Sequence, residues 1–379
     1  MNIVTTLTIV ISLLISSSSW AAPKPVPEPP VLEADSYFLM DYDSGRVLAE
    51  KNPDRPVEPA SITKLMTMYL VDKAIADGDI TLDDMVLISE KAWRMQGSKM
   101  FVEVGKRVSV LDLIQGVIIQ SGNDASVALA EYISGTESAF AEYMNFQAKL
   151  LGMTNTNFKN ATGWPAEGHY STARDIAILT QAIIRDFPDS YRYYREKEFT
   201  FNGIRQFNRN RLLWRDESVD GVKTGRTEAA GYCLVASAKR EDMRLISVVF
   251  GAASDEERTQ DSQSLLNYGF RFFQTYRLYS ADEVLKTARV WYGDQKEVSM
   301  GVEKDIYVTI PRGRYSELDA SMDIESQIFA PIARGQELGI VKIKLDDEMI
   351  VNEKIVATQA VNEGSLVSRA IDRIKLMFK

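Results

Sequence analysis

Three short motifs combine residue types that could carry out nucleophilic catalysis. They are Ser61-Ile-Thr-Lys64, Ser121-Gly-Asn123 and Lys223-Thr-Gly225, in this order along the chain. Ser-x-x-Lys and Ser-x-Asn are weak signals by themselves, because a chain of this length contains about one of each by chance. Lys-Thr-Gly is rarer, at about one chain in ten. Together the three motifs predict a site with a nucleophilic serine.

Ser61 and Lys64 could form a pair of nucleophile and base. Apolar residues recur at helical spacing from Ile62 onward, so Ser61 would open a helix and Lys64 would project beside it. Burial, the helix N-terminus and the charge of Lys223 would lower the pKa of Lys64. A neutral lysine could then take the serine proton. The alternative is a capping serine followed by a surface lysine, which we would favour if the motif stood alone.

The other two motifs could surround this pair. Ser121 and Asn123 lie in a tight turn between helical segments, where Ser121 could relay protons to the leaving amine and Asn123 could bind the substrate amide. Lys223 and Thr224 open a strand, whose edge could pair with a peptide while both side chains attract its terminal carboxylate. The plain alternatives are a helix cap and a solvated strand end.

Composition excludes several other classes of protein. The chain has 379 residues, 45% of them hydrophobic, and a net charge of −9, which offers no general attraction to nucleic acid. The single histidine, His169, and the single cysteine, Cys233, argue against a catalytic zinc site, so no metal or cofactor is expected. We expect His169 to be structural and Cys233 to be buried in a strand.

The order of the predicted elements indicates an α+β domain followed by a small all-β domain. A hairpin around Asp43-Ser44-Gly45 comes first, and then a helical block. Its helices are predicted at Val110–Gln120, Ala125–Ile133, Ala139–Leu151 and Thr172–Phe187. Strands at Gly221–Thr224, Gly231–Ala238 and Leu245–Phe250 precede a helix over Glu256–Tyr276. An antiparallel sheet between helices is therefore expected, with short strands from residue 284 onward.

The chain resembles the low-molecular-mass penicillin-binding proteins of the serine D-alanyl-D-alanine carboxypeptidase family over nearly its whole length. The resemblance rests on longer phrases around the motifs. They are Pro59-Ala-Ser-Ile-Thr-Lys-Leu-Met-Thr67, Ile119-Gln-Ser-Gly-Asn-Asp-Ala125, Tyr170-Ser-Thr-Ala-Arg-Asp175, Asn208-Arg-Asn210 and Asp220-Gly-Val-Lys-Thr-Gly225. It implies the penicillin-recognising transpeptidase and β-lactamase-like fold, and an acyl-enzyme on Ser61 that releases D-alanine from peptidoglycan stem peptides ending in D-Ala-D-Ala.

The resemblance also implies roles for further residues. Substrate binding would involve Asn123, Lys223, Thr224, Gly225 and Arg226, with Arg209 and Arg258 as basic groups at the carboxylate end. The backbone N–H groups of Ser61 and Arg226 would form the oxyanion hole. β-Lactams would acylate Ser61 as covalent inhibitors. Arg226 stands where the best-known relatives often have histidine, which puts its side chain's effect on substrate preference and deacylation in doubt.

The predicted organisation has five parts. They are a signal peptide (1–21), a proline-rich spacer (22–35), the catalytic domain (36–283), an all-β domain (284–362) and an amphipathic membrane-anchor helix (363–379). The apolar stripe of this helix comprises Leu366, Val367, Ala370, Ile371, Ile374, Met377 and Phe378. The helix is too short and polar to span a bilayer. The resemblance places the exported protein on the periplasmic face of the bacterial inner membrane, bound peripherally.

Three other functions stay open on sequence grounds. A β-lactamase shares two of the motifs, although Gly122 stands where many β-lactamases have aspartate. A peptidoglycan DD-endopeptidase would differ only in its substrate. A non-catalytic envelope scaffold would retain the fold alone, but the full set of motif residues argues against a decayed site.

Overall fold

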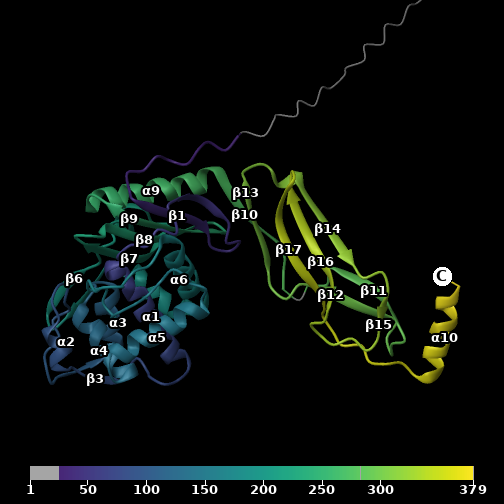
Figure 1. Ribbon diagram of the computed structural model, residues 1–379, viewed down its shortest axis with the longest axis horizontal. Coiled ribbons are helices and arrows are strands. Elements are labelled where there is room, and N and C mark those ends of the chain that lie inside the picture. The colour runs from purple at the N-terminus through teal and green to yellow at the C-terminus, as the bar shows by residue number, and fades with distance from the viewer. Residues whose placement is uncertain (1–24, 282, 379) are drawn as a thin grey trace, which may run out of the picture.

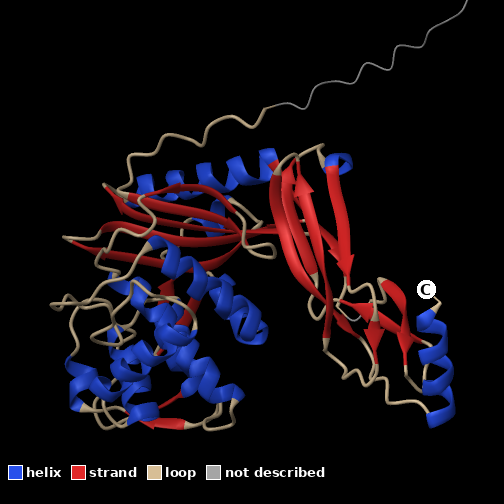
Figure 2. Cartoon of the chain, turned by 45° about the vertical axis from the view of Figure 1, so that its right-hand side comes forward, coloured by secondary structure: helices blue, strands red, loops and turns tan. Residues whose placement is uncertain are grey.

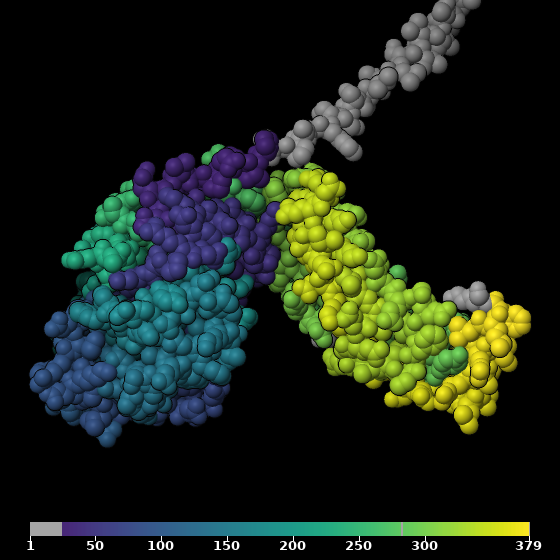
Figure 3. All heavy atoms as spheres, in the orientation of Figure 1, coloured from purple at the N-terminus to yellow at the C-terminus, as the bar shows by residue number. Residues whose placement is uncertain are grey.

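The computed structural model describes residues 25–281 and 283–378, which form two domains. The predicted signal peptide lies outside the described residues. Figure 3 shows the two domains in contact at one end and diverging from there, so that a wide notch separates their outer parts. No helix in the described ranges has the length and apolar character needed to cross a bilayer.

An antiparallel sheet of five strands forms the centre of the first domain, in the order β2-β1-β9-β8-β7. The strands are β1 (Ser36–Asp41), β2 (Val47–Lys51), β7 (Val219–Thr227), β8 (Gly231–Arg240) and β9 (Met243–Ala252). The predicted hairpin and the three predicted strands are all present. Strand β7, which carries the Lys-Thr-Gly motif, is an edge strand of this sheet.

Helices cover both faces of the sheet, as Figure 2 shows and as the sequence predicts. The alternation of side chains along β1 explains this arrangement, because Phe38 and Met40 join the core under the helical block, whereas Tyr37 and Leu39 join the core under α9 (Asp255–Phe272). Both sets are buried. The sheet is therefore apolar on both faces, and each face requires a covering layer.

The helical block contains the elements that hold the motifs. It consists of the 3-10 turn η1 (Ala60–Thr63) and the helices α1 (Lys64–Ala76), α2 (Glu90–Arg94), α3 (Val110–Ile118), α4 (Asn123–Ser134), α5 (Glu137–Leu150) and α6 (Ala173–Asp186). The four helices predicted in this block by residue range end within two residues of their predicted bounds. Side chains at their first turns explain the starts, since Ser109, Thr136 and Thr172 each accept a backbone N–H as N-caps of α3, α5 and α6.

Shorter elements complete the first domain. They are the hairpin of β3 (Met85–Leu87) and β4 (Arg107–Ser109), α7 (Pro188–Tyr191), the 3-10 turn η2 (Arg192–Arg195), the hairpin of β5 (Glu198–Phe201) and β6 (Ile204–Phe207), and α8 (Leu212–Arg215). The last hairpin and α8 lead directly into β7. They therefore fix the loop that contains Arg209.

The described part of the predicted proline-rich spacer, residues 25–35, packs onto the first domain. Residues 25–35 form no helix or strand, but Leu32 and Ala34 are buried in the core beneath α9. The Tyr268 hydroxyl of α9 donates to the Pro27 carbonyl over 3.0 Å. Figure 1 shows this segment following α9. The prolines favour an extended backbone that can lie along the helix.

The predicted helix over 256–276 is wrong in its last four residues. Helix α9 ends at Phe272, and the chain continues directly as strand β10 (Phe273–Tyr279). This strand pairs antiparallel with β13 (Ile306–Pro311), whose partner residues lie about thirty positions further along. Aromatic and β-branched residues favour the strand, and long-range pairing overrides the helical spacing of the apolar residues.

The second domain is all-β apart from one short turn and the C-terminal helix. Six strands pair in the order β14-β16-β17-β12-β11-β15. They are β11 (Lys286–Trp291), β12 (Glu297–Gly301), β14 (Leu318–Ile324), β15 (Ile328–Phe329), β16 (Glu337–Leu345) and β17 (Glu348–Ala357), with the 3-10 turn η3 (Tyr315–Glu317) before β14. A separate apolar core joins this sheet to the β10–β13 pair.

Polar contacts join the two domains where the β1–β2 turn meets β10 and β13. The Thr275 hydroxyl donates to Asp41 Oδ2 over 2.6 Å and lies 2.8 Å from the Thr309 hydroxyl. Ser44 Oγ lies 2.6 Å from Thr309 Oγ1, and Arg46 donates to the Thr309 carbonyl over 2.8 Å. Because Asp41, Thr275 and Thr309 are buried, these bonds form in the interior of the junction.

Helix α10 (Leu366–Met377) lies against the outer end of the second domain. Its single buried residue, Asp372, accepts the backbone N–H of Tyr292 over 3.0 Å and lies 3.4 Å from Arg289. The predicted apolar stripe points away from the domain, and all seven of its residues are exposed. Leu366 and Phe378 expose 84% and 87% of their surface. The helix therefore docks through a polar residue and leaves its apolar side uncovered.

Candidate active site

Ser61 and Lys64 meet at the junction between a 3-10 turn and helix α1. Ser61 lies in η1 and Lys64 is the first residue of α1. Lys64 Nζ is 3.0 Å from Ser61 Oγ, 2.7 Å from Asn123 Oδ1 and 2.6 Å from the Thr162 carbonyl oxygen. The side chain of Lys64 is fully buried. Three oxygens thus surround one amine, and one of them belongs to the predicted nucleophile.

The surroundings of Lys64 favour its neutral form. Burial lowers the pKa of Lys64 to about 7, with a further lowering by Arg209 that Asp124 partly opposes. The neighbouring positive charge that lowers the pKa of Lys64 is therefore that of Arg209, whereas the sequence analysis expected that of Lys223. A neutral amine has two N–H bonds, which suit Asn123 Oδ1 and the Thr162 carbonyl, and one lone pair, which can accept the Ser61 hydroxyl proton. The amine is arranged as a base at neutral pH.

Ser121 and Asn123 reach the same place from the turn between α3 and α4. Ser121 has a positive φ of 64°, and its buried hydroxyl has no hydrogen-bond partner among the described residues. Asn123 binds Lys64 through its oxygen and donates its amide to the Gln96 carbonyl over 2.6 Å. Asp124 secures the turn by accepting the backbone N–H groups of Met100 and Phe101. The strained turn leaves a free hydroxyl in the cleft.

Lys223, Thr224 and Gly225 approach from strand β7. Lys223 is buried and donates to the Thr224 carbonyl over 3.1 Å. Burial and then the charge of Lys64 hold the pKa of Lys223 well below its usual value. A Cβ atom on Gly225 would lie 3.2 Å from atoms of both Ala60 and Ile62, so the absence of a side chain lets β7 pack closely against η1. This contact brings the third motif beside the first.

Two cavities meet at Ser61. We call the first the arginine lobe; it has a volume of about 370 Å³. Its lining residues are Ser61, Ser98, Ser121, Asn208, Arg209, Arg211, Thr224, Gly225, Arg226, Tyr232, Asp255 and Arg258. The second, the tryptophan lobe of about 610 Å³, shares Ser61, Ser98 and Arg226 and adds Asn123, Thr162 and Trp164 among others. The nucleophile therefore stands where two differently lined cavities join.

All ten predicted catalytic and substrate-binding residues lie in or beneath these lobes. Ser61, Ser121, Asn123, Thr224, Gly225 and the three predicted arginines Arg209, Arg226 and Arg258 line them. Lys64 and Lys223 are buried beneath the surface. Arg258 donates to the carbonyls of Gly225 and Cys233 over 3.0 and 3.1 Å, so much of its bonding capacity is used within the protein.

His169 and Cys233 lie outside the lobes. His169 Nε2 is 2.9 Å from the Thr63 hydroxyl, and burial lowers the pKa of His169 to about 4. Cys233 is buried in β8, as predicted, and burial raises its pKa to about 12. In the described ranges no group of three or more His, Cys, Asp or Glu side chains could hold a metal ion.

Several residues of the site were missed by the sequence analysis. The Thr162 carbonyl and Gly163 come from the loop before α6, and Ser98 and Trp164 line the lobes. Of these residues, only Gly163 could have been suspected from the sequence, because a glycine can mark a backbone position that other residues do not tolerate. Its φ is +82°, and a Cβ atom there would lie 1.7 Å from the Ala60 carbonyl oxygen. Backbone contacts of this kind leave no trace in side-chain motifs.

Comparison with known families decides the classification. Residues 24–254 match the family model described as D-alanyl-D-alanine carboxypeptidase, and residues 273–363 match the C-terminal domain of penicillin-binding protein 5. The chain belongs to the D-alanyl-D-alanine carboxypeptidase family. It is therefore a serine hydrolase with the penicillin-binding protein fold and an all-β C-terminal domain.

Individual members of this family are similar to this chain along most of their own length. The D-alanyl-D-alanine carboxypeptidase DacC of Escherichia coli is 47% identical over 96% of this chain and 93% of its own. A crystal structure of penicillin-binding protein 5 from Haemophilus influenzae matches with 45% identity and a TM-score of 0.85, over 89% of this chain and all of that one. Penicillin-binding protein D2 of Listeria monocytogenes, solved in its ampicillin-bound form, is 31% identical over 63% of this chain and 98% of its own, with a TM-score of 0.59.

Proposed function

We propose that this family member is a serine D-alanyl-D-alanine carboxypeptidase that removes the terminal D-alanine from peptidoglycan stem peptides through an acyl-enzyme on Ser61. The observation that carries the proposal is the pairing of Ser61 Oγ with Lys64 Nζ at 3.0 Å, where the pKa of the amine is about 7. The pair opens onto a lobe lined by four arginines, which suits a substrate with a free carboxylate.

In the first step, Ser61 Oγ attacks the carbonyl carbon of the D-Ala-D-Ala peptide bond while Lys64 Nζ takes the hydroxyl proton. The backbone N–H groups of Ser61 and Arg226 stabilise the negative oxygen of the tetrahedral intermediate. Ser121 passes a proton from Lys64 to the leaving amine, the C–N bond breaks, and D-alanine departs. The free Ser121 hydroxyl supports this relay, because no described residue competes for it.

In the second step, water completes the turnover. The acyl group is now an ester on Ser61, and Lys64 is again neutral because its proton has left with D-alanine. Lys64 Nζ can therefore take a proton from an attacking water, and the intermediate collapses to release the shortened peptide and restore the Ser61 hydroxyl. A β-lactam, which carries an acylating carbonyl and a carboxylate, would follow the first step and remain attached.

The substrate's two ends fit the two lobes by charge. The terminal carboxylate is expected in the arginine lobe, beside Thr224 and Arg209. The rest of the peptide is expected to leave through the tryptophan lobe, where Glu58, Glu228 and Trp164 replace most of the arginines. The edge strand β7 can pair with the peptide backbone between them.

Replacement of the nucleophile tests the mechanism. We expect Ser61→Ala to abolish D-alanine release and penicillin labelling, and intact-protein mass spectrometry of the wild type to show one penicillin adduct, mapped to the tryptic peptide of residues 52–64. Ser98→Ala is the matched control, because Ser98 also lines both lobes. Continued D-alanine release by Ser61→Ala would rule the mechanism out.

The competing functions differ in products. Rapid hydrolysis of a chromogenic cephalosporin would indicate a β-lactamase, whereas a carboxypeptidase should form a long-lived acyl-enzyme. Cleavage of cross-linked muropeptides from isolated sacculi, analysed by chromatography, would reveal DD-endopeptidase activity. Binding of stem peptides without any product would indicate a scaffold. We expect D-alanine release to exceed both other activities.

We further infer that the exported protein attaches peripherally to the outer face of the cytoplasmic membrane through α10. The exposure of the whole apolar stripe supports this, as do Arg369, Arg373 and Lys375 on the same helix, which suit an anionic lipid surface. Export itself rests on the predicted signal peptide, whose removal should leave Ala22 as the first residue of the mature chain.

Vesicle flotation tests the attachment. We expect the protein to float with anionic phospholipid vesicles and to lose this behaviour in the double variant Ile371→Asp/Ile374→Asp. The control is Ala320→Asp/Ser321→Asp, which adds the same charge to the edge strand β14. This strand lies across the sheet from β11, whose Arg289 contacts Asp372 of α10. Equal flotation of both variants would contradict the anchor.

A further inference from the structure

The arginine lobe has one carboxylate among its lining residues, that of Asp255. Four guanidinium groups line the same cavity, and like charges this close repel one another. Asp255 is the first residue of α9, and the backbone N–H groups at this end of the helix favour a negative charge. Asp255 is therefore placed to decide how the positive charge of the lobe is arranged.

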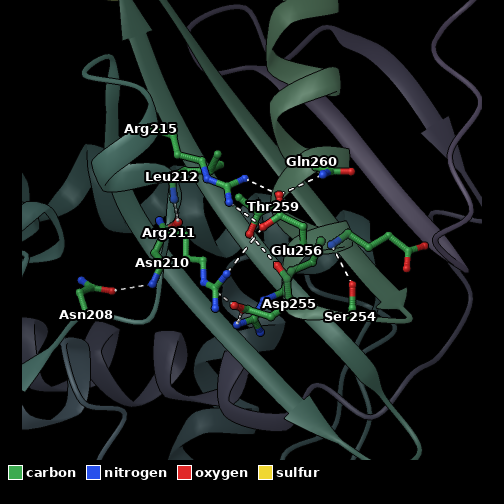
Figure 4. Close-up of polar contacts among 12 residues, drawn as sticks. Asn208, Asn210, Arg211, Leu212, Arg215, Ser254, Asp255, Glu256, Thr259 and Gln260 are labelled. Atoms are coloured by element: carbon green, nitrogen blue, oxygen red, sulfur yellow. Dashed lines mark hydrogen bonds and ion pairs between the residues drawn. The ribbon is translucent and has the colours of Figure 1, made fainter.

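Asp255 binds two of the four arginines. Its Oδ2 atom lies 2.6 Å from Arg211 Nε, and its Oδ1 atom accepts a hydrogen bond from Arg258. Figure 4 shows Arg211 extending from its loop to Asp255 at the start of α9. Arg258 is buried and also donates to the carbonyls of Gly225 and Cys233. Both guanidinium groups are thus committed to groups of the protein.

Arg209 has no such partner. Among the described residues it forms no hydrogen bond or ion pair, although Asn208 and Asn210 on either side of it are buried and bonded. Asn208 donates to the Glu196 carbonyl over 2.9 Å and Asn210 to the Gly221 carbonyl over 2.8 Å. The backbone at Arg209 is held in place while its side chain, which is partly accessible, stays free in the lobe.

We propose that Asp255 is a positioning residue that holds Arg211 and Arg258 on the protein, so that the substrate's terminal carboxylate pairs with Arg209 and Thr224. This inference rests on the proposed carboxypeptidase function. Without the carboxylate of Asp255, Arg211 keeps only its longer ion pair with Glu256, at 3.6 Å, and Arg258 loses one of its three partners.

The test is the variant Asp255→Asn, assayed with diacetyl-L-Lys-D-Ala-D-Ala. We expect KM to rise roughly five- to twentyfold, as for the weakening of one charge-assisted contact, with kcat within about twofold. The carboxylate contact is present in both ground and transition states, so its weakening changes KM more than kcat. Asp255→Glu, which keeps the charge but shifts it by one methylene group, should restore most of the affinity.

Glu256→Gln is the matched control. Glu256 is the next residue of α9 and pairs with Arg215 at 2.6 Å and Arg211 at 3.6 Å, but it does not line the lobe. We expect its KM to match the wild type. Titration with penicillin gives the active fraction of each preparation, so that a folding defect in Asp255→Asn is separated from a change in KM.

The outcomes distinguish this inference from the proposed function. If the wild type releases no D-alanine, the proposed function fails and the inference with it. If the wild type is active but Asp255→Asn keeps its KM, or Glu256→Gln raises KM equally, only the inference is overturned. Should Asp255→Asn not fold, an unchanged KM in Arg211→Gln would overturn it, because that variant removes the ion pair between Arg211 and Asp255.

Discussion

Lys64 Nζ is closer to the carbonyl oxygen of Thr162, at 2.6 Å, than to the Ser61 hydroxyl that it is expected to activate, at 3.0 Å. The Thr162 carbonyl can accept a hydrogen bond but cannot donate one. It therefore orients the amine without competing for its lone pair. The lone pair is left for the Ser61 proton, provided that the amine is neutral.

The pH dependence of acylation should follow the charge of Lys64. Because the pKa of Lys64 is about 7, the amine is an ammonium group below this pH and cannot act as a base. We expect the second-order rate of penicillin acylation to fall about tenfold per pH unit below pH 7 and to level off above it. Stopped-flow measurements from pH 5 to 9 test this, and a rate that is constant over this range would exclude Lys64 as the base.

Replacement of Lys64 by arginine should remove the base without removing the charge. Guanidinium stays protonated at any working pH. We expect Lys64→Arg to lower the acylation rate by about 10²- to 10⁴-fold, the usual contribution of general base catalysis, and to remove the pH dependence. The same stopped-flow assay applies, and a residual rate that still titrates near pH 7 would point to another group.

Gly163 should be needed for the position of Ser61. A Cβ atom there would lie 1.7 Å from the Ala60 carbonyl oxygen, in the turn that carries Ser61. We expect Gly163→Ala to lower penicillin acylation about 100-fold by displacing the nucleophile. Gly152→Ala is the control, because Gly152 has almost the same φ, +83° against +82°, but no atom within 4 Å of the added methyl group. Equal loss in both variants would show that backbone strain alone is responsible.

Asp72 should make stability depend on pH. This carboxyl group is buried in α1 without a hydrogen-bond partner among the described residues, and burial raises its pKa from 3.8 to about 7; the nearby Ser190 hydroxyl offsets this only in part. The folded state therefore keeps the proton that the unfolded state loses. The contribution of Asp72 to stability is complete below about pH 4 and is lost as pH rises through about 7.

Asp72→Asn tests this linkage. Its free energy of unfolding, relative to that of the wild type, should increase by about 1–3 kcal/mol between pH 5 and pH 8, because only the wild type loses stability over this interval. Urea unfolding at the two pH values measures the difference. A difference that stays constant with pH would mean that Asp72 is ionised in the folded protein throughout.

The junction between the domains should depend on Thr275. Its hydroxyl is a buried donor to Asp41 Oδ2, so Thr275→Val leaves a buried carboxylate oxygen without this partner. We expect a loss of about 1–3 kcal/mol in the free energy of unfolding. Thr287→Val on the exposed side of β11 is the control, with an expected change below about 0.5 kcal/mol. Calorimetry would also show whether the two domains unfold together.

Local features of the site could be predicted from the sequence because they depend on spacing along one helix. Ser61 and Lys64 are three residues apart, and any helical turn brings such positions together. The other partners of Lys64 are Asn123, at the start of α4, and Thr162, in a loop, which lie 59 and 98 residues away. Asn123 was found only because it belongs to a motif, whereas a backbone carbonyl such as that of Thr162 has no sequence signature.

The pairing of the arginines in the lobe with Asp255 could not be predicted from the sequence either. Arg209 and Arg258 were predicted as basic groups, but which of them is free depends on Asp255 and on the close packing of α9 against β8. The boundary between α9 and β10 shows the same limit, because residues 273–276 continue the helical spacing and become a strand only through pairing with β13. Tertiary partners decide both cases.

Helix α10 and helix α1, which begins at Lys64, lie in different domains in Figure 1. If the apolar stripe of α10 enters lipid as we propose, the all-β domain would act as a stalk that sets the height at which hydrolysis takes place. The enzyme would then diffuse in two dimensions and trim only those cell-wall strands that pass at this height above the bilayer.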